Sequence, residues 1–283
     1  MAERGRLFVV AVPIGHLEDI TLRALRTLRE ATVIACEDTR RTSQLLELLG
    51  VARPRLVAFH EHNEEAKTPL VIEVLESGRD VALVSDAGTP TISDPGYPLL
   101  KAAVTGGYTV VPIPGPCAAI TALSASGLPT DRFRFVGFPP AKLEARRRFL
   151  EELSGATETL ILYVGPHDLD DILALASEVF GPSRPAVVAR ELTKMYEEFR
   201  RDTLLALSTS PGKNRGEIVL LIGGRESDEA PTEDDLQKIA QTIIDEGFGG
   251  ARAAKELTRR TGANRDEAYR AILRLRAGEH ETD

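Results

Sequence analysis

Apolar and polar positions alternate along the first half of the chain so that short apolar runs are separated by amphipathic stretches. The apolar runs occupy residues 7–12, 32–37, 55–62, 80–86 and 108–115. Runs of this length are typical of strands covered on both faces. Between them, apolar residues recur at helical spacing, as at Leu22, Leu25 and Leu28. This order of elements predicts a parallel α/β sheet.

The second half repeats the alternation from about residue 116. Strands are predicted at residues 132–138, 159–164, 185–192 and 216–224, and helices at 117–127, 143–153 and 168–180. The pattern predicts two α/β domains, at residues 1–115 and 116–225.

Charge separates the rest of the chain from these two domains. Residues 226–246 hold eight acidic side chains and one lysine, whereas residues 247–276 hold eight Lys/Arg and three acids. We expect an acidic linker followed by a basic helical domain over 226–283, with helices at 233–245, 251–261 and 264–276. A turn at 262–264 makes this tail compatible with a helix-turn-helix.

Composition limits the class of protein. The chain has 283 residues, is 42% hydrophobic and carries two cysteines, too few for a disulfide framework or a zinc cluster. Pro13 interrupts the first apolar run, which is too short for a signal peptide, and no run approaches the roughly 20 apolar residues of a membrane span. We expect a cytoplasmic protein. The net charge of −8 argues mildly against wholesale nucleic-acid binding.

Common nucleotide and hydrolase motifs are absent from the sequence: it has no GxGxxG after the first strand, no GxxxxGK[ST] and no GxSxG. His60 and His62 would share one face of a strand and could bind a metal ion. Since no third ligand is evident, ordinary hydrogen-bonding roles are the alternative, and we expect no metal site.

Four loops rich in glycine, proline and polar residues follow predicted strands. They are Val12–Gly15, Glu37–Arg40, Ser85–Gly96 and Ile113–Ala119. Ligands of open α/β sheets bind outside the carboxyl ends of the strands, so these loops predict a cleft lined largely by main chain. Plain turns and capped helix starts are the alternative. The loop SDAGTPTISDPG favours function because it is much longer than the two to six residues that usually join a strand to a helix.

The stretches VPIGHLEDITLRAL, ACEDTRRT, FHEHNE, LVSDAGTPTISDPG, PIPGPCAAITALSASGLPTDRF, GFPP, ARELTK and GEIVLLI carry a family resemblance. With them the chain resembles the tetrapyrrole-methylase-like (class III) S-adenosylmethionine methyltransferases. Within these it is similar to the enzymes that 2′-O-methylate a cytidine of 16S ribosomal RNA in the small ribosomal subunit. The resemblance runs from residue 7 to about 222, and the basic tail matches that family's helical domain.

The resemblance implies a two-domain fold, a homodimer, and S-adenosyl-L-methionine bound in the cleft between the domains. The donor-binding residues that it implies are Val12, Pro13, Ile14, Asp86, Ala87, Gly88, Thr89, Ile92, Pro116, Cys117, Ala118, Val164 and Glu217.

A ribose hydroxyl is a weak nucleophile, so a proton acceptor should assist methyl transfer. The carboxylates in the loops are Glu37, Asp38, Asp86 and Asp94. We favour Asp86 and Glu37 as the base, with Arg40 orienting a carboxylate or a phosphate. The alternative is that these acids only hold the loops in shape.

RNA phosphates require Lys or Arg side chains. The candidates are Arg40, Arg41, Arg146, Arg147, Arg148, Arg252, Lys255, Arg259, Arg260 and Arg265. For the run at 146–148, a solvated helix face is the alternative.

Three other functions remain open. A tetrapyrrole methylase proper would carry a GxGPGDP-type first loop, which VPIGHLED is not. Diphthine synthase, on the same scaffold, is disfavoured by the basic tail. A non-enzymatic ribosome-assembly factor would leave the cleft loops unexplained.

Overall fold

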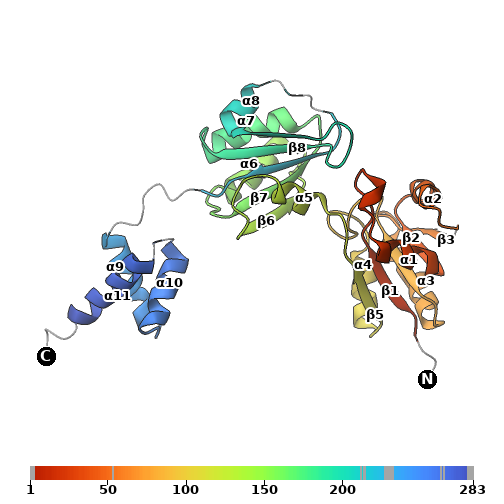
Figure 1. Ribbon diagram of the computed structural model, residues 1–283, viewed down its shortest axis with the longest axis horizontal. Coiled ribbons are helices and arrows are strands. Elements are labelled where there is room, and N and C mark those ends of the chain that lie inside the picture. Colours follow the sequence, from red (N-terminus) through yellow and green to blue (C-terminus); the bar gives the residue numbers. More distant parts are fainter. Residues whose placement is uncertain are drawn as a thin grey trace. The chain divides into compact units, whose positions relative to one another are not determined.

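The computed structural model describes residues 4–52, 54–210, 212, 215–225, 233–261, 263 and 265–278, without the side chains of 233–235, 259 and 276–278. The chain divides into two compact units, Met1–Gly224 and Arg225–Asp283 (Figure 1). Each unit is described by itself.

The first sheet contains five parallel strands. They are β1 (Arg6–Val10), β2 (Val33–Cys36), β3 (Arg55–Ala58), β4 (Val81–Val84) and β5 (Thr109–Ile113). Their order is β3-β2-β4-β1-β5, and every neighbouring pair is parallel, which confirms the predicted parallel α/β sheet. The connecting helices are α1 (Leu22–Glu30), α2 (Thr39–Leu48), α3 (Glu64–Glu76) and α4 (Tyr97–Thr105), with a short 3-10 helix, η1 (Leu17–Asp19), before α1.

Helices cover both faces of this sheet, which explains its continuous apolar strands. On β2, Ile34 and Cys36 pack in one core with α1 and α2, whereas Val33 and Ala35 pack in a second core with α3 and α4. Successive residues of a strand point to opposite faces, so all four residues of β2 are buried.

The histidine pair lies outside the strand on which we predicted it. Strand β3 ends at Ala58, so His60 and His62 belong to the turn that leads into α3. The Nε2 atom of His60 is 2.9 Å from the side-chain nitrogen Nδ2 of Asn63. The backbone N–H of His60 donates to the side-chain oxygen Oδ1 of Asn63 at 2.9 Å. The predicted shared strand face is therefore wrong. The described residues contain no group of three or more His, Cys, Asp or Glu that could hold a metal ion.

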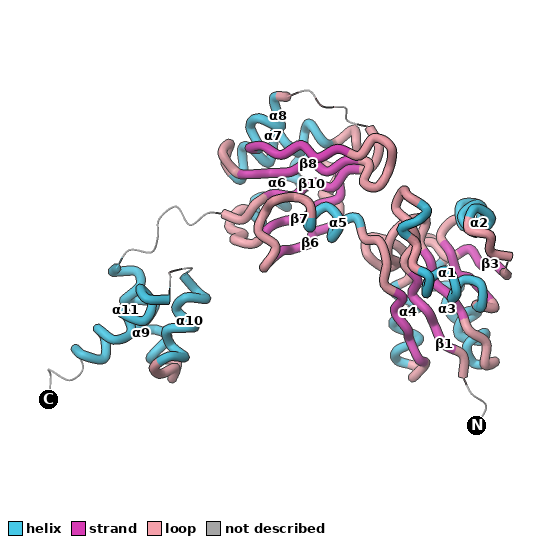
Figure 2. The backbone as a smooth tube through the Cα atoms, in the orientation of Figure 1, coloured by secondary structure: helices cyan, strands magenta, loops and turns pink. Residues whose placement is uncertain are grey.

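The second sheet is mixed. Its strands are β6 (Phe133–Gly137), β7 (Thr159–Val164), β8 (Pro185–Arg190), β9 (Glu198–Thr203) and β10 (Ile218–Ile222), in the order β6-β7-β10-β8-β9 (Figure 2). Only β6 and β7 are parallel, and the other three pairs are antiparallel. Its helices are α5 (Ala118–Ser124), α6 (Leu143–Leu153), α7 (Leu169–Phe180) and α8 (Leu204–Thr209).

Strand β9 and helix α8 were not predicted. The sequence of β9, EFRRDT, has no buried residue, because this strand forms the exposed edge of the sheet. An edge strand with charged side chains lacks the apolar run by which buried strands are recognised.

The two faces of the second sheet pack against different partners. Helices α6, α7 and α8 cover one face. On the other face, α5 packs over β7, β8 and β10 together with Ile14, which comes from the loop after β1. The loop of the first sheet thus contributes to the core of the second.

The tail forms a three-helix unit with its own core. Helices α9 (Glu233–Asp245), α10 (Ala251–Thr261) and α11 (Arg265–Gly278) bury Ile243, Leu257 and Ile272 against one another. Of the predicted turn, Gly262 and Asn264 lie outside the described residues, as does the predicted linker at 226–232. The three predicted domain limits stay predictions. Among the described helices, none has the length and apolarity that crossing a membrane requires.

Candidate active site

A cavity of about 310 Å³ lies at the ends of two central strands of the second sheet, β7 and β10. The end of β7 and the start of β10 form one side of it, because β10 runs antiparallel to β7 with Ile218 opposite Val164. The other side consists of the loop after β4, Ile14 and Ala118. Three of the four predicted loops therefore contribute to one concave site.

Backbone hydrogen bonds fix the long loop after β4 to the two other loops. Val12 N–H donates to the Gly88 carbonyl at 2.9 Å, and Gly88 N–H donates to the Val12 carbonyl at 3.1 Å. Gly88 has φ +75°, a conformation that glycine adopts without strain. Thr89 Oγ1 then donates to the Pro116 carbonyl at 2.9 Å. The loop is long because it spans both neighbouring loops and still lines the cavity.

Two cavity residues sit between pairs of strained residues. Thr91 and Ser93, on either side of Ile92, have φ of 71° and 63°. Leu192 is flanked in the same way by Glu191 and Thr193, with φ of 50° and 65°. These four are the non-glycine residues with positive φ in the described part of the chain. Each costs about 1–3 kcal/mol, and such strain is concentrated at functional sites.

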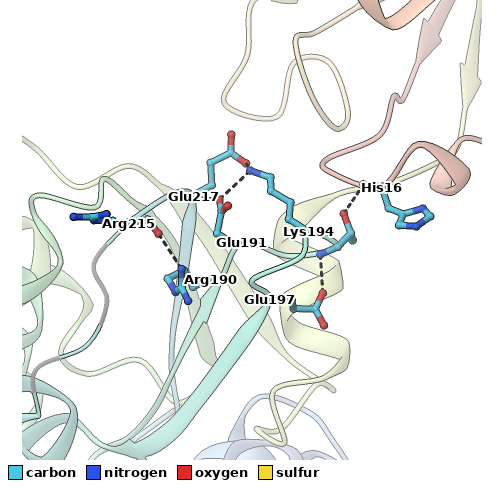
Figure 3. Close-up of polar contacts among 8 residues, drawn as sticks. His16, Arg190, Glu191, Lys194, Glu197, Arg215 and Glu217 are labelled. Atoms are coloured by element: carbon cyan, nitrogen blue, oxygen red, sulfur yellow. Dashed lines mark hydrogen bonds and ion pairs between the residues drawn. The ribbon is translucent and has the colours of Figure 1, made fainter. Parts of the chain in front are cut away.

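A polar network joins the turn after β8 to the cavity wall (Figure 3). Lys194 Nζ contacts Glu191 Oε1 at 3.0 Å and Glu217 Oε2 at 3.1 Å, and Glu217 lines the cavity. Thr193 Oγ1 accepts a hydrogen bond from the backbone N–H of His16 at 3.0 Å, and the Thr193 N–H donates to Glu197 at 2.6 Å. Partial burial lowers the pKa of Lys194, but hydrogen bonds to Glu191 and Glu217 outweigh this effect and raise it. Lys194 therefore stays charged.

The predicted catalytic residues form a charged cluster around the start of α2. Asp86 accepts a hydrogen bond from the backbone N–H of Asp38 at 3.0 Å and pairs with Arg41 at 3.1 Å. Asp38 caps α2 by accepting from the N–H of Arg40 at 2.8 Å, and its carboxylate also pairs with the Arg40 guanidinium at 2.9 Å. These contacts give Asp38 the capping role that we weighed as its alternative.

The two remaining acidic candidates both have raised pKa values. Burial raises the pKa of Glu37, and the nearby charge of Asp86 adds to the effect. Burial also raises the pKa of Asp94, to about 6. A hydrogen bond from Ser85 lowers this pKa, whereas the charges of Glu37 and Asp86 raise it further. Of the four acidic candidates, Asp94 is the one that lines the cavity.

Seven of the predicted donor-binding residues line the cavity: Ile14, Ala87, Gly88, Ile92, Ala118, Val164 and Glu217. The other six do not line it: Val12, Pro13, Asp86, Thr89, Pro116 and Cys117. Sequence reasoning gave no role to the wall residues Phe138, Tyr163 and Leu192, although GFPP and ARELTK were among the stretches noted. Their signal was an apolar or aromatic residue at the end of a strand or just after it.

The predicted phosphate contacts differ in availability. The Arg146 side chain is only 5% exposed and pairs with Asp168 at 2.7 Å, so its prediction as a phosphate contact is wrong. Arg147 pairs with Glu178 at 2.8 Å, whereas Arg148 is exposed.

In the tail, Arg252, Lys255 and Arg265 are exposed. Arg260 forms an ion pair with Glu246 that ties α10 to the end of α9, and a second one with Glu256 within α10. The side chain of Arg259 lies outside the described residues.

Comparison with known proteins gives consistent matches. Residues 6–208 match the family model of tetrapyrrole (corrin/porphyrin) methylases. The ribosomal RNA small subunit methyltransferase I of Mesorhizobium japonicum is 44% identical over 280 residues, 98% of this chain and 94% of that protein. The protein of the same name from Pseudomonas aeruginosa is 47% identical over 245 residues, 85% of this chain and 86% of that protein.

Solved structures share the fold at low sequence identity. The methyltransferase CobJ aligns with a TM-score of 0.60 at 20% identity, covering 78% of this chain and 94% of its own. Uroporphyrin-III C-methyltransferase of Thermus thermophilus, complexed with S-adenosyl homocysteine, aligns with a TM-score of 0.54 at 20% identity, covering 77% and 97%.

Replacing Asp94 with asparagine is expected to raise the free energy of unfolding at pH 8 and to give no gain below about pH 4. Folding raises the pKa of this carboxyl from 3.8 to about 6, so its contribution to stability falls as the pH rises between these values. Urea unfolding of both proteins across this range measures the difference. Asp131→Asn, at an exposed position, should show no such pH dependence. A variant less stable than the parent at pH 8 would contradict the assignment.

Proposed function

Because the chain belongs to the tetrapyrrole methylase family, and within it to the ribosomal RNA small subunit methyltransferase I family, we propose that it methylates 16S ribosomal RNA. The donor is S-adenosyl-L-methionine, and the acceptor is the 2′-hydroxyl of a cytidine ribose in the small ribosomal subunit. The observation that carries this proposal is 44% identity over 98% of the chain to a protein of that name. The cavity supports it with a wall suited to a donor of this kind.

The chemistry of the cavity wall fits the methyl donor. The donor carries positive charge on its sulfonium and ammonium groups, and the wall offers the carboxylates of Asp94 and Glu217. Among the described residues, no cationic side chain lowers the pKa of Asp94, so a cationic ligand bound beside it would stabilise the charged carboxylate. Ile14, Ala118 and Val219 supply apolar surface for the adenosine part. When bound, the donor supplies a methyl group already activated for displacement by its sulfonium sulfur.

We assign the acceptance of the hydroxyl proton to the cluster beside the cavity, with Glu37 as the base. Its raised pKa brings Glu37 nearer to neutral pH, where a general base works best. Both carboxylate oxygens of Asp86 are already engaged by Asp38 and Arg41. Asp86 therefore acts by holding the start of α2 and by raising the pKa of Glu37. Arg40 is exposed and lies beside this cluster, where it can orient a phosphate of the acceptor strand.

The basic residues that remain exposed support binding of the RNA backbone. Among the predicted phosphate contacts, the exposed ones in the first unit are Arg40, Arg41 and Arg148, and those in the tail include Arg252, Lys255 and Arg265. Cations on both units would let the tail contribute affinity for the subunit while the cavity supplies the chemistry.

We further propose that the protein is a cytoplasmic homodimer. The family resemblance supports the dimer, and the most exposed apolar side chains of the first unit, Met195 at 89% and Leu22 at 87%, offer surface for contact between copies. A cytoplasmic location fits a ribosomal substrate.

Incubation with S-adenosyl-L-methionine carrying a labelled methyl group tests the main proposal. We expect label in 16S RNA when small subunits are supplied, and expect the modified linkage to resist alkaline hydrolysis because the 2′-oxygen is blocked. Asp94→Asn should weaken donor binding about tenfold or more by calorimetry, since a charge-assisted contact is lost. Label in a porphyrinoid instead, or in neither substrate, would overturn the assignment.

Replacing Glu37 with glutamine is expected to lower kcat by about 10²–10⁴-fold while donor affinity changes little, because the amide accepts no proton. The acid limb of the parent's pH profile should lie above 4.5, the ordinary value for a glutamate. Single-turnover methyl transfer to small subunits measures both. Glu65→Gln, at an exposed position on α3, serves as control. Full turnover by the Glu37 variant would exclude it as the base.

Replacing Arg252 and Lys255 with glutamate is expected to weaken binding to small subunits and to reduce its salt dependence by roughly one unit of slope per lost phosphate contact. Filter binding at several salt concentrations measures the slope, and calorimetry should show unchanged donor affinity. The matched control is Lys101→Glu, at an exposed position of α4. Loss of donor binding in the tail variant would contradict separate roles for the two units.

A further inference from the structure

Phe138 is an exposed aromatic side chain at the mouth of the cavity. It lines the cavity, yet 60% of its surface remains open to solvent. Aromatic residues make up only 5% of the chain, and tryptophan is absent. An exposed phenylalanine does not gain the hydrophobic free energy of burying its ring. Its exposure therefore indicates that a binding partner covers it.

The ring is held from behind by other aromatic side chains. Its centroid lies 5.5 Å from that of Tyr163 at an interplanar angle of 62°, and Tyr163 packs on Phe135 at 4.9 Å and 68°. The hydroxyl of Tyr163 accepts a hydrogen bond from the N–H of Ala119 at 3.3 Å. These edge-to-face contacts fix the orientation of Phe138 while part of its surface stays uncovered.

The turn that follows Phe138 is also fixed. Buried Arg146 donates from Nε to the Pro140 carbonyl at 2.9 Å and pairs with Asp168 on its other side. The arginine that sequence reasoning assigned to RNA thus holds the GFPP segment in place. A rigid turn of this kind keeps an exposed side chain preorganised for a ligand.

A second exposed apolar residue lies on the loop that meets this segment. A Cβ atom on Gly137 would be 3.7 Å from Ser93 Oγ, so the loop carrying Ile92 contacts the end of β6. Ile92 lines the cavity and is 39% exposed, between the left-handed residues Thr91 and Ser93. Phe138 and Ile92 together form an apolar rim on the cavity, which we call the rim pair.

We propose that the rim pair holds the nucleobase of the acceptor nucleotide, with Phe138 stacking on the pyrimidine ring and Ile92 contacting it as a second apolar surface. This inference rests on the proposed RNA methyltransferase function. A ligand enclosed in the cavity leaves the outer surface of Phe138 uncovered, because pockets bury most of a small ligand but not their own outer rim. Unpaired bases stack on aromatic side chains, and an enzyme that modifies a nucleotide inside a folded RNA must first take it out of the helix. The rim pair would then position the ribose hydroxyl at the cavity mouth.

Substitution at Phe138 tests this role. For Phe138→Ala we expect kcat/KM for small subunits to fall by about 5- to 150-fold, the usual effect of losing one base-stacking contact, while the dissociation constant of S-adenosyl-L-methionine changes less than twofold. Most of the loss should appear in KM. Phe138→Tyr and Phe138→Trp should restore most of kcat/KM, whereas Phe138→Leu should not, since leucine offers apolar volume without a flat ring.

Phe133→Ala is the matched control. Phe133 begins β6, the strand that ends just before Phe138, and is 45% exposed, but it does not line the cavity, so its loss should leave both constants within twofold of the parent. Unchanged kcat/KM in Phe138→Ala, full rescue by leucine, or an equal loss of donor affinity would each overturn the inference. If the parent protein transfers no methyl group to RNA, the proposed RNA methyltransferase function is wrong. The assay of the parent protein alone gives that result, so it is distinguished from a failure of the base-stacking role.

Discussion

Two backbone hydrogen bonds between Val12 and Gly88 hold the site together. They join the loop after β1 to the loop after β4, two neighbouring strands of the first sheet. Because the bonds use main-chain atoms, the side chains of both loops remain available for other contacts. The side chain of Ile14 packs in the core of the second sheet, and those of Ile92 and Asp94 line the cavity. The concave site depends on this main-chain bridge because it holds the loop after β1 and the loop after β4 side by side.

Strain and charge are both concentrated around this cavity. The left-handed residues at 91, 93, 191 and 193 flank two of its wall residues, and the acids with raised pKa values lie on its wall or beside it. Packing elsewhere in the fold must compensate for these unfavourable features, and the fully buried β10 is an example of such packing. Asp94 and Glu217 give the cavity wall carboxylates, and under the proposed function these would suit a cationic donor while exposed cations outside the cavity would contact RNA phosphates. This arrangement is compatible with the net charge of −8.

The sequence was sufficient to predict the first sheet because its central strands β2 and β4 are buried on both faces and therefore apolar throughout. It was insufficient for β9, whose charged residues lie at a sheet edge. The loops of the site could be recognised from their glycines, prolines and aspartates. The roles of the side chains within them could not be assigned from sequence. Asp86 is bound by Asp38 and Arg41, whereas Asp94 lines the cavity, and this difference depends on tertiary contacts. Arg146 is a second example. The sequence does not distinguish the three consecutive arginines at 146–148, but in helix α6 Arg146 lies on the buried face and pairs with Asp168.

The strand order of the first sheet has a consequence for synthesis of the protein. Strand β1 is made first, but its two partners are β4 and β5, which end at Val84 and Ile113. No hairpin can hold β1 in the meantime, because parallel neighbours require long crossovers. During translation the apolar segment Leu7–Val10 therefore stays unpaired until β4, which ends at residue 84 of the 283, has been made, a period in which exposed apolar segments of nascent chains are prone to aggregation.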